Sequence, residues 1–150
     1  MPIFDHLTLT VSNLQRSAEF YTAALAPLGF TRQRDYGEIL AFGPEGMPAF
    51  WLKAGPAPQS PMHLAFGARE RSAVDGFHAA ALKAGAKDDG APGLREHYHP
   101  NYYGAFIIDP DGHHIEAVCH VPVGIHAAVK RKTAAKKKAP AKKKAGKKKR

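Results

Sequence analysis

The chain has 150 residues and a formal net charge of +9, but the positive charge is concentrated at one end. Residues 130–150 hold 13 of the 22 lysine and arginine residues and no acidic residue, so the remainder carries nine basic and 13 acidic residues. The single cysteine excludes an intrachain disulfide, and no export signal or long apolar membrane-spanning run is present. We therefore expect a cytoplasmic protein with one domain in residues 1–122, followed by a linker and basic tail in residues 123–150.

The first half of this domain, residues 1–54, has the pattern of a β-α-β-β-β unit. Residues 3–11 alternate as in a strand, with Leu7 and Leu9 on one face and His6 on the other. A helix is expected to begin at Ser12, which has capping-box spacing to Gln15, and to end at Pro27 and Gly29. Three short strands are expected next, at residues 30–34, 39–42 and 49–53.

The same order of elements recurs in residues 62–122, after a linker rich in glycine and proline. A strand at residues 62–67 places His63 on its polar face, and a helix runs from Ser72 toward Gly85. A short strand near Lys87 and an irregular polar segment are expected before the final hairpin. The fold class predicted from this repeat is α+β, with two βαβββ modules.

The final hairpin spans residues 102–120 and turns at Asp-Pro-Asp-Gly. Its second strand places Glu116 among apolar residues, where a carboxylate is costly to bury without a partner. His6, His63 and Glu116 all lie on strand faces turned away from the main apolar side. Two imidazoles and one carboxylate can hold a catalytic divalent metal, although each residue taken alone is more typical of an exposed or structural position.

These residues and their surroundings resemble the vicinal oxygen chelate superfamily, which includes glyoxalase I, bleomycin-resistance proteins and extradiol dioxygenases. The resemblance covers residues 1–122 and is carried by five motifs: Phe4-Asp5-His6-Leu7-Thr8-Leu9-Thr10-Val11, Phe20-Tyr21, Leu28-Gly29-Phe30, His63-Leu64-Ala65-Phe66 and Asp109-Pro110-Asp111-Gly112-His113-His114-Ile115-Glu116. It implies two modules in a curved mixed sheet that closes around a divalent metal ion (Fe, Mn, Zn or Ni). The metal ligands would be His6, His63 and Glu116, and the protein would be a homodimer.

One position departs from glyoxalase I, in which a glutamate on the last strand of the first module is a fourth ligand. Trp51 stands at the matching position, and its ring nitrogen can only donate a hydrogen bond. We therefore expect an enzyme acting on a small oxygen-bearing substrate, of lyase, isomerase or dioxygenase type, without lactoylglutathione lyase activity. Trp51 itself is expected to fill the core.

Other side chains near the hairpin could serve the chemistry. Histidine has a suitable pKa for proton transfer, and we assign possible catalytic roles to His99 and Tyr103. The alternative is a solvated loop. Neighbouring candidates for the same roles are His97 and Tyr102, whereas we expect His113 and His114 to be exposed and Cys119 to be packed under a helix.

Two other functions remain open at this stage. The first is a metal-free protein that sequesters a drug or metabolite, as bleomycin-resistance proteins do. The second uses residues 130–150 to bind DNA, RNA or another polyanion without sequence specificity, because the tail has many cations and no aromatic residue. The tail could equally be an appendage unrelated to the chemistry.

Overall fold

The structure is a computed structural model that describes residues 4–123. The first module contains strand β1, helix α1, a short 3₁₀ turn η1 and three further strands. Their bounds are Leu7–Val11 for β1, Leu14–Leu25 for α1, Ala26–Leu28 for η1, Thr31–Asp35 for β2, Ile39–Gly43 for β3 and Phe50–Ala54 for β4. The second module repeats this order, with His63–Gly67 for β5, Arg71–Lys83 for α2, Lys87–Leu94 for β6, Tyr103–Ile108 for β7 and His114–Cys119 for β8.

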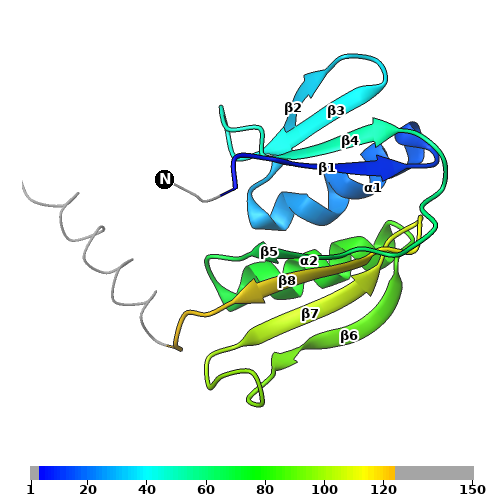
Figure 1. Ribbon diagram of the computed structural model, residues 1–150. Helices are drawn as coiled ribbons and strands as arrows, with labels where there is room; N and C mark the ends of the chain where they lie inside the picture. Colours follow the sequence, from blue (N-terminus) through cyan, green and yellow to red (C-terminus); the bar gives the residue numbers. More distant parts are fainter. Residues whose placement is uncertain (1–3, 124–150) are drawn as a thin grey trace, which may run out of the picture.

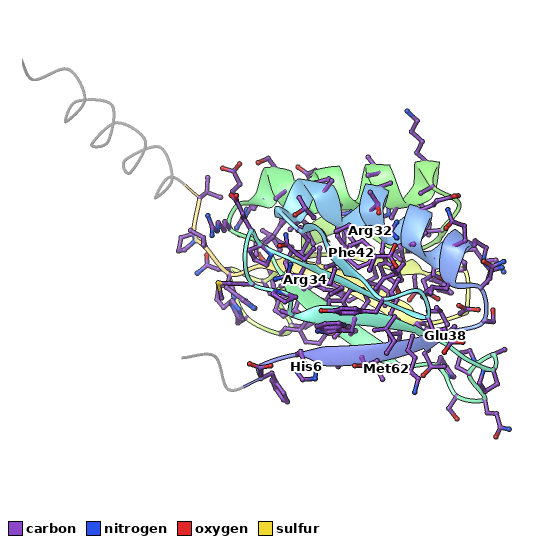
Figure 2. The ribbon with its side chains drawn as sticks, turned by 90° about the horizontal axis from the view of Figure 1, so that it is seen from above. His6, Arg32, Arg34, Glu38, Phe42 and Met62 are labelled. Atoms are coloured by element: carbon purple, nitrogen blue, oxygen red, sulfur yellow. The ribbon has the colours of Figure 1, made fainter. Side chains whose placement is uncertain are left out.

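Each module forms a four-stranded sheet with the same topology, which confirms the predicted α+β fold of two βαβββ modules. The strand orders are β1-β4-β3-β2 and β5-β8-β7-β6, and the first pair in each order is parallel while the others are antiparallel. The two sheets lie one beside the other, with β1 and β5 at their facing edges (Figure 1). Both helices lie on one side of the sheets, and His6 lies on the other (Figure 2).

The strand registers define which positions of the two modules correspond. In the first module Thr8 lies opposite Trp51, and in the second Ala65 lies opposite Glu116. His6 and His63 each precede this pair by two residues and so share its face. The repeat therefore places Trp51 at the position equivalent to Glu116.

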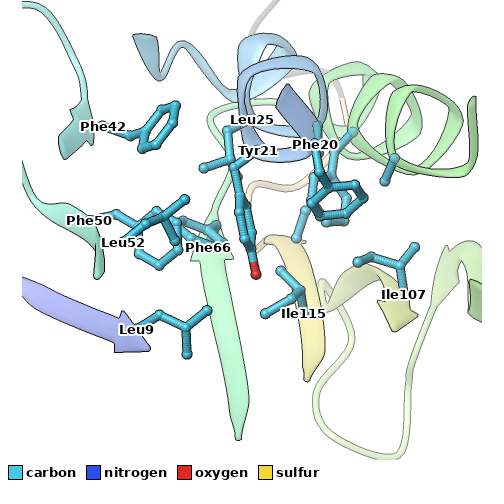
Figure 3. Close-up of a cluster of buried hydrophobic side chains, with 14 of the residues drawn as sticks. Leu9, Phe20, Tyr21, Leu25, Phe42, Phe50, Leu52, Phe66, Ile107 and Ile115 are labelled. Atoms are coloured by element: carbon cyan, nitrogen blue, oxygen red, sulfur yellow. The ribbon is translucent and has the colours of Figure 1, made fainter. Parts of the chain in front are cut away.

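One apolar core connects the two modules beneath the helices, as the cluster in Figure 3 shows. Tyr21 of α1 is fully buried in this core and donates a hydrogen bond of 2.6 Å to Asp109 in the turn before β8. Burial, together with the nearby Asp109 carboxylate, raises the pKa of Tyr21 well above its ordinary value. Cys119 is also buried in the core, as expected.

The Asp-Pro-Asp-Gly turn of the second module also holds the first module in place. Asp111 accepts hydrogen bonds from the Ser12 N–H (3.1 Å) and from the Arg16 guanidinium (3.0 Å), both at the start of α1. Ser12 is therefore not the helix cap that its spacing predicted. Asn13 has that role, because its side chain accepts a hydrogen bond of 3.0 Å from the Arg16 N–H.

The strand predicted near Lys87 is present and is longer than expected: β6 has eight residues, and its register is broken by bulges around Gly90. One further local prediction was wrong. His113 is buried rather than exposed, because its Nδ1 accepts a hydrogen bond of 3.0 Å from the Met62 N–H at the start of β5. Within residues 4–123, no helix has the length and apolar character needed to cross a bilayer.

Candidate functional site

The second module carries a buried carboxylate on the sheet face opposite the helices. Glu116 of β8 is 2% exposed, and its Oε2 atom lies 3.1 Å from Nε2 of His63 on the neighbouring strand β5. The other carboxylate oxygen, Oε1, accepts a hydrogen bond of 2.5 Å from the Tyr102 hydroxyl. Both oxygens of Glu116 are thus engaged, which satisfies a carboxylate that would be costly to bury alone. His63, by contrast, keeps 60% of its side chain exposed and can contact a bound molecule.

Tyr102 is held in position by the shape of strand β7. Gly104 lies on the same face, and a Cβ atom there would lie 3.1 Å from Oε1 of Glu116 and 3.2 Å from the ring of Tyr102. The missing side chain therefore leaves room for the tyrosine ring beside the carboxylate. Desolvation, followed by the hydrogen bond to Glu116, raises the pKa of Tyr102, so its hydroxyl remains protonated and acts as a donor at neutral pH.

A pair of histidines lies against the other side of Tyr102. Nε2 of His99 and Nδ1 of His120 are 2.6 Å apart, and both rings contact the Tyr102 ring, with centroid distances of 5.6 and 5.1 Å. His99 was predicted as a catalytic residue, and it lies one aromatic ring away from Glu116. His120, which follows β8 directly, was not singled out from the sequence.

Tyr103 was the other predicted catalytic residue, and the structure places it on the opposite face of β7. Its hydroxyl donates a hydrogen bond of 2.7 Å to Asp75 of α2, and this bond raises its pKa. The guanidinium carbon of Arg71, also on α2, lies 5.0 Å from the centre of its ring. Because adjacent residues of a strand point to opposite faces, Tyr102 lies at the Glu116 site and Tyr103 lies under the helix.

His6 lies in the first module, apart from His63 and Glu116. Its Nδ1 is 2.7 Å from Asp5, and its ring makes an edge contact with Trp51 at 6.2 Å. Trp51 is half-buried and stacks on Tyr36, with the ring planes 4° apart, so it lies outside the apolar core that it was expected to fill. The first module therefore presents an imidazole beside an aromatic surface, where the second presents an imidazole beside a carboxylate.

The donors present fit part of a divalent-metal site. An imidazole nitrogen and a carboxylate oxygen that already lie within contact distance are suitable ligands for zinc, iron or manganese. Within residues 4–123 of a single chain, however, no group of three or more histidine, cysteine or acidic side chains could hold a metal ion. His63 and Glu116 thus supply two of the expected ligands, and this chain does not bring His6 to them.

Sequence reasoning missed Gly104 as well as His120 at this site. Gly104 interrupts the apolar run of β7, and a glycine inside a strand is a general signal of close approach by another group. Tyr102 was named as a candidate beside Tyr103, but the starting residue of the strand, and hence the face of each tyrosine, could not be fixed from the pattern.

Comparison with known proteins agrees with this architecture. Residues 3–117 match the family model described as Glyoxalase/Bleomycin resistance protein/Dioxygenase superfamily. A comparison with curated proteins finds no significant match.

Several solved structures share the fold. A glyoxalase/bleomycin resistance protein from Albidiferax ferrireducens T118 is 27% identical, with a TM-score of 0.69, over 79% of this chain and 99% of that chain. A glyoxalase/bleomycin resistance protein/dioxygenase family enzyme from Burkholderia phytofirmans PsJN has 18% identity and a TM-score of 0.61, covering 78% of this chain and 98% of that one. A glyoxalase-related enzyme from Fulvimarina pelagi has 18% identity and a TM-score of 0.60, covering 79% and 88%. With the family match spanning most of the described domain, the chain belongs to the glyoxalase/bleomycin resistance protein/dioxygenase superfamily.

Proposed function

We propose that the protein is a divalent-metal-dependent enzyme acting on a small oxygen-bearing substrate, with its chemistry on the face of the second module that carries Glu116. The observation that carries this proposal is the buried Glu116 carboxylate, which contacts His63 on one oxygen and Tyr102 on the other. A half-exposed imidazole beside a fixed carboxylate is a ligand pair that leaves positions open for substrate.

The residues around this pair have distinct roles in the proposal. A bound metal ion would act as a Lewis acid toward the substrate oxygens. Tyr102 holds Glu116 in position and, with its raised pKa, stays a hydrogen-bond donor. The hydrogen-bonded pair of His99 and His120 lies against Tyr102 and supplies imidazole nitrogens for proton transfer.

The third ligand in this proposal is His6 from a second copy of the chain. Within one chain His6 contacts Asp5 and Trp51, and no three-ligand group forms among residues 4–123. A two-fold symmetric dimer repeats every contact, so if the first module of one copy lies against the second module of the other, the reciprocal contact forms as well. Two equivalent sites would then form, each using residues from both chains.

Mixing two defective variants tests this arrangement. His6→Ala and Glu116→Ala proteins are purified separately, combined by refolding or co-expression, and analysed for metal content. Each variant alone should retain little metal. The mixture should recover about one quarter of the parent's metal, because a mixed dimer would contain one site with both native residues and one with neither.

The outcomes separate the alternatives. No recovery in the mixture, with both single variants depleted, would place all three ligands in one chain. Parent-level metal in both single variants would contradict the metal assignment. A parent protein that binds no divalent metal would favour the metal-free sequestration function instead.

A second candidate function concerns residues 130–150, which lie outside the described residues. We propose that this segment binds nucleic acid or another polyanion without sequence specificity, because 13 of its residues are basic and none is acidic. Duplex DNA binding is measured for the full chain and for a variant ending at residue 129, at two salt concentrations.

The truncated variant should lose most of its DNA affinity while keeping its melting temperature and metal content. For the full chain, the logarithm of affinity should fall with the logarithm of salt by roughly 0.9 per phosphate contacted. DNA affinity that survives truncation, or that does not depend on salt, would contradict the proposal.

A further inference from the structure

Close to the Glu116 site lies an arginine that has no acidic partner within residues 4–123. Arg95 follows β6, and its N–H donates a hydrogen bond of 2.8 Å to the Tyr102 carbonyl oxygen, which closes the loop of residues 96–101. Its guanidinium carbon lies 5.3 Å from the centre of the Phe106 ring. The centre of the same Phe106 ring lies 6.3 Å from the centre of the His63 ring, which belongs to strand β5 on the other side of β7 from β6. Phe106 therefore separates the imidazole from the guanidinium.

The strand face shows that these groups share one surface. Phe106 is the register partner of Glu116, and a Cβ on Gly104 would contact the Glu116 carboxylate, the Tyr102 ring and the Phe106 ring together. Phe106 is thus on the Glu116 face of β7, away from the helices. Arg95, which lies over Phe106, is on that face as well.

Two glycines of β6 leave room for the guanidinium of Arg95 to lie against the strand. A Cβ on Gly90 would lie 3.4 Å from Nη2 of Arg95, and a Cβ on Gly93 would lie 3.0 Å from Nη1. The absence of both side chains lets the guanidinium lie close to the bulged strand. Its Nη2 donates to the Ala91 carbonyl oxygen at 2.8 Å, which fixes its orientation.

The charge of this guanidinium is not neutralised within the described domain. Residues 1–129 contain more acidic than basic side chains, yet no carboxylate in residues 4–123 forms an ion pair with Arg95. Arginine remains charged at all relevant pH values, and among the described residues only two carbonyl oxygens, those of Ala91 and Leu94, accept hydrogen bonds from its five side-chain N–H groups. The remaining donors can bind an oxyanion, and the planar fork fits a carboxylate or a phosphate group.

From this juxtaposition we infer that Arg95 binds the anionic group of the molecule that occupies the Glu116 site. The substrate is then a small organic acid, a carboxylate or an organic phosphate, whose reacting oxygens lie at His63 and Glu116 while its anionic end extends across Phe106 to Arg95. This inference rests on the proposed function for the position of the reacting group, but the anion contact is measurable independently of any metal.

Arg71 provides a matched control. Its guanidinium lies 5.0 Å from the ring of Tyr103, a geometry close to that of Arg95 over Phe106, but on the helix-covered face of the same strand. Arg71→Gln therefore removes an arginine stacked on an aromatic ring of β7 without removing charge from the Glu116 face.

The test uses the full chain, with and without added Zn²⁺, and three probes: acetate, its neutral isostere acetamide, and methylphosphonate. Side-chain Nε–Hε signals of arginine in NMR spectra report binding at each guanidinium, and variants assign the Arg95 signal. Acetate or methylphosphonate should shift the Arg95 signal, and acetamide should not. Arg95→Gln should weaken oxyanion binding at this site about tenfold, whereas Arg71→Gln should leave it unchanged.

Each result has a defined meaning. An Arg95 signal that responds to neither anion, or that responds equally to acetamide, would overturn the inference. This result can be obtained with the parent protein alone. Equal losses in Arg95→Gln and Arg71→Gln would also overturn it. Zinc content measured on the same samples isolates the proposed function, because Arg95 is not a metal ligand: an Arg95 response without zinc binding would contradict the metal site and leave the anion contact standing. The stronger of the two anions shows whether the Arg95 guanidinium prefers a carboxylate or a phosphate-type group, for which methylphosphonate is the analogue.

Discussion

The two modules share one backbone plan but present different chemistry at equivalent positions. Their registers pair Thr8 with Trp51 and Ala65 with Glu116, so one module has an indole where the other has a carboxylate. Trp51 is stacked on Tyr36, and its ring N–H is buried without a hydrogen-bond partner among the described residues. Glu116 has a partner on each oxygen. The repeat therefore preserves strand pairing and side-chain face, while the polar chemistry is concentrated in the second module.

Removing either ligand of the second module should have the largest effect on metal binding. His63→Ala and Glu116→Ala should each reduce the metal content to a small fraction of the parent value, because no other described side chain replaces the lost donor. Elemental analysis of the purified proteins measures this effect. His114→Ala is the control, since His114 is the register neighbour of His63 but pairs with Asp89 at 2.7 Å. Depletion in the control as well would mean that the variants lose metal by unfolding.

The contact between modules should be the next most sensitive feature. Asp109→Ala removes Oδ2, the acceptor of the buried Tyr21 hydroxyl, and Oδ1, which accepts from the Asp111 and His113 N–H groups. Loss of a buried, charge-assisted network of this kind should lower the free energy of unfolding by about 3 kcal/mol. Denaturant unfolding monitored by circular dichroism gives this value.

A second tyrosine–aspartate contact serves as the control for that prediction. Asp75→Ala removes the acceptor of the Tyr103 hydroxyl, but this contact is exposed to solvent. Water can replace the lost acceptor, so the expected loss is below about 1 kcal/mol. Similar losses of unfolding free energy for the two variants would show that burial does not make the Tyr21–Asp109 contact more stabilising than the exposed one.

A smaller effect is expected at Gly104, where the modules differ again. Gly104 and Ile39 occupy equivalent positions in the two modules, because each pairs with the residue two positions after Glu116 or Trp51. The first module, which has no buried carboxylate among its described residues, therefore has a side chain at this position, and the second module has none. Gly104→Ala should push Tyr102 and Glu116 apart by a few tenths of an ångström and weaken metal affinity about tenfold. Competition with a metal-binding dye measures this change.

Gly67→Ala is the matched control for the glycine variant. Gly67 ends β5 in the same module, its φ is not positive, and a Cβ there would meet no atom within 4 Å. The Gly67→Ala variant should bind metal with the same affinity as the parent protein. If both glycine variants bind metal normally, the close approach at Gly104 does not control the site.

The sequence predicted the fold well because the strand period of two and the repeated order of elements are local signals. It placed His6, His63 and Glu116 on the correct strand faces for the same reason. It could not determine which of them meet, because their proximity depends on how the modules pack, and Tyr103 was preferred to Tyr102 because a one-residue error in a strand reverses the face. The buried position of His113 depends on a hydrogen bond to Met62, more than fifty residues away in the chain.

The last prediction concerns Trp51 and has the smallest expected effect, since it is an absence of activity. Glyoxalase I resembles this chain but has a glutamate ligand where Trp51 lies, and an indole has no lone pair to offer a metal. The unaltered protein, loaded in turn with Zn²⁺, Ni²⁺ and Mn²⁺, should therefore not convert the methylglyoxal–glutathione hemithioacetal above the rate of the uncatalysed reaction. Trp51→Phe should also show no turnover and should bind metal as the parent does, because it keeps an aromatic ring beside Tyr36 and loses the pyrrole ring with its N–H, which has no partner among the described residues. Robust turnover by the parent would show that the fourth ligand is dispensable, and the difference between the two modules would then not determine the reaction.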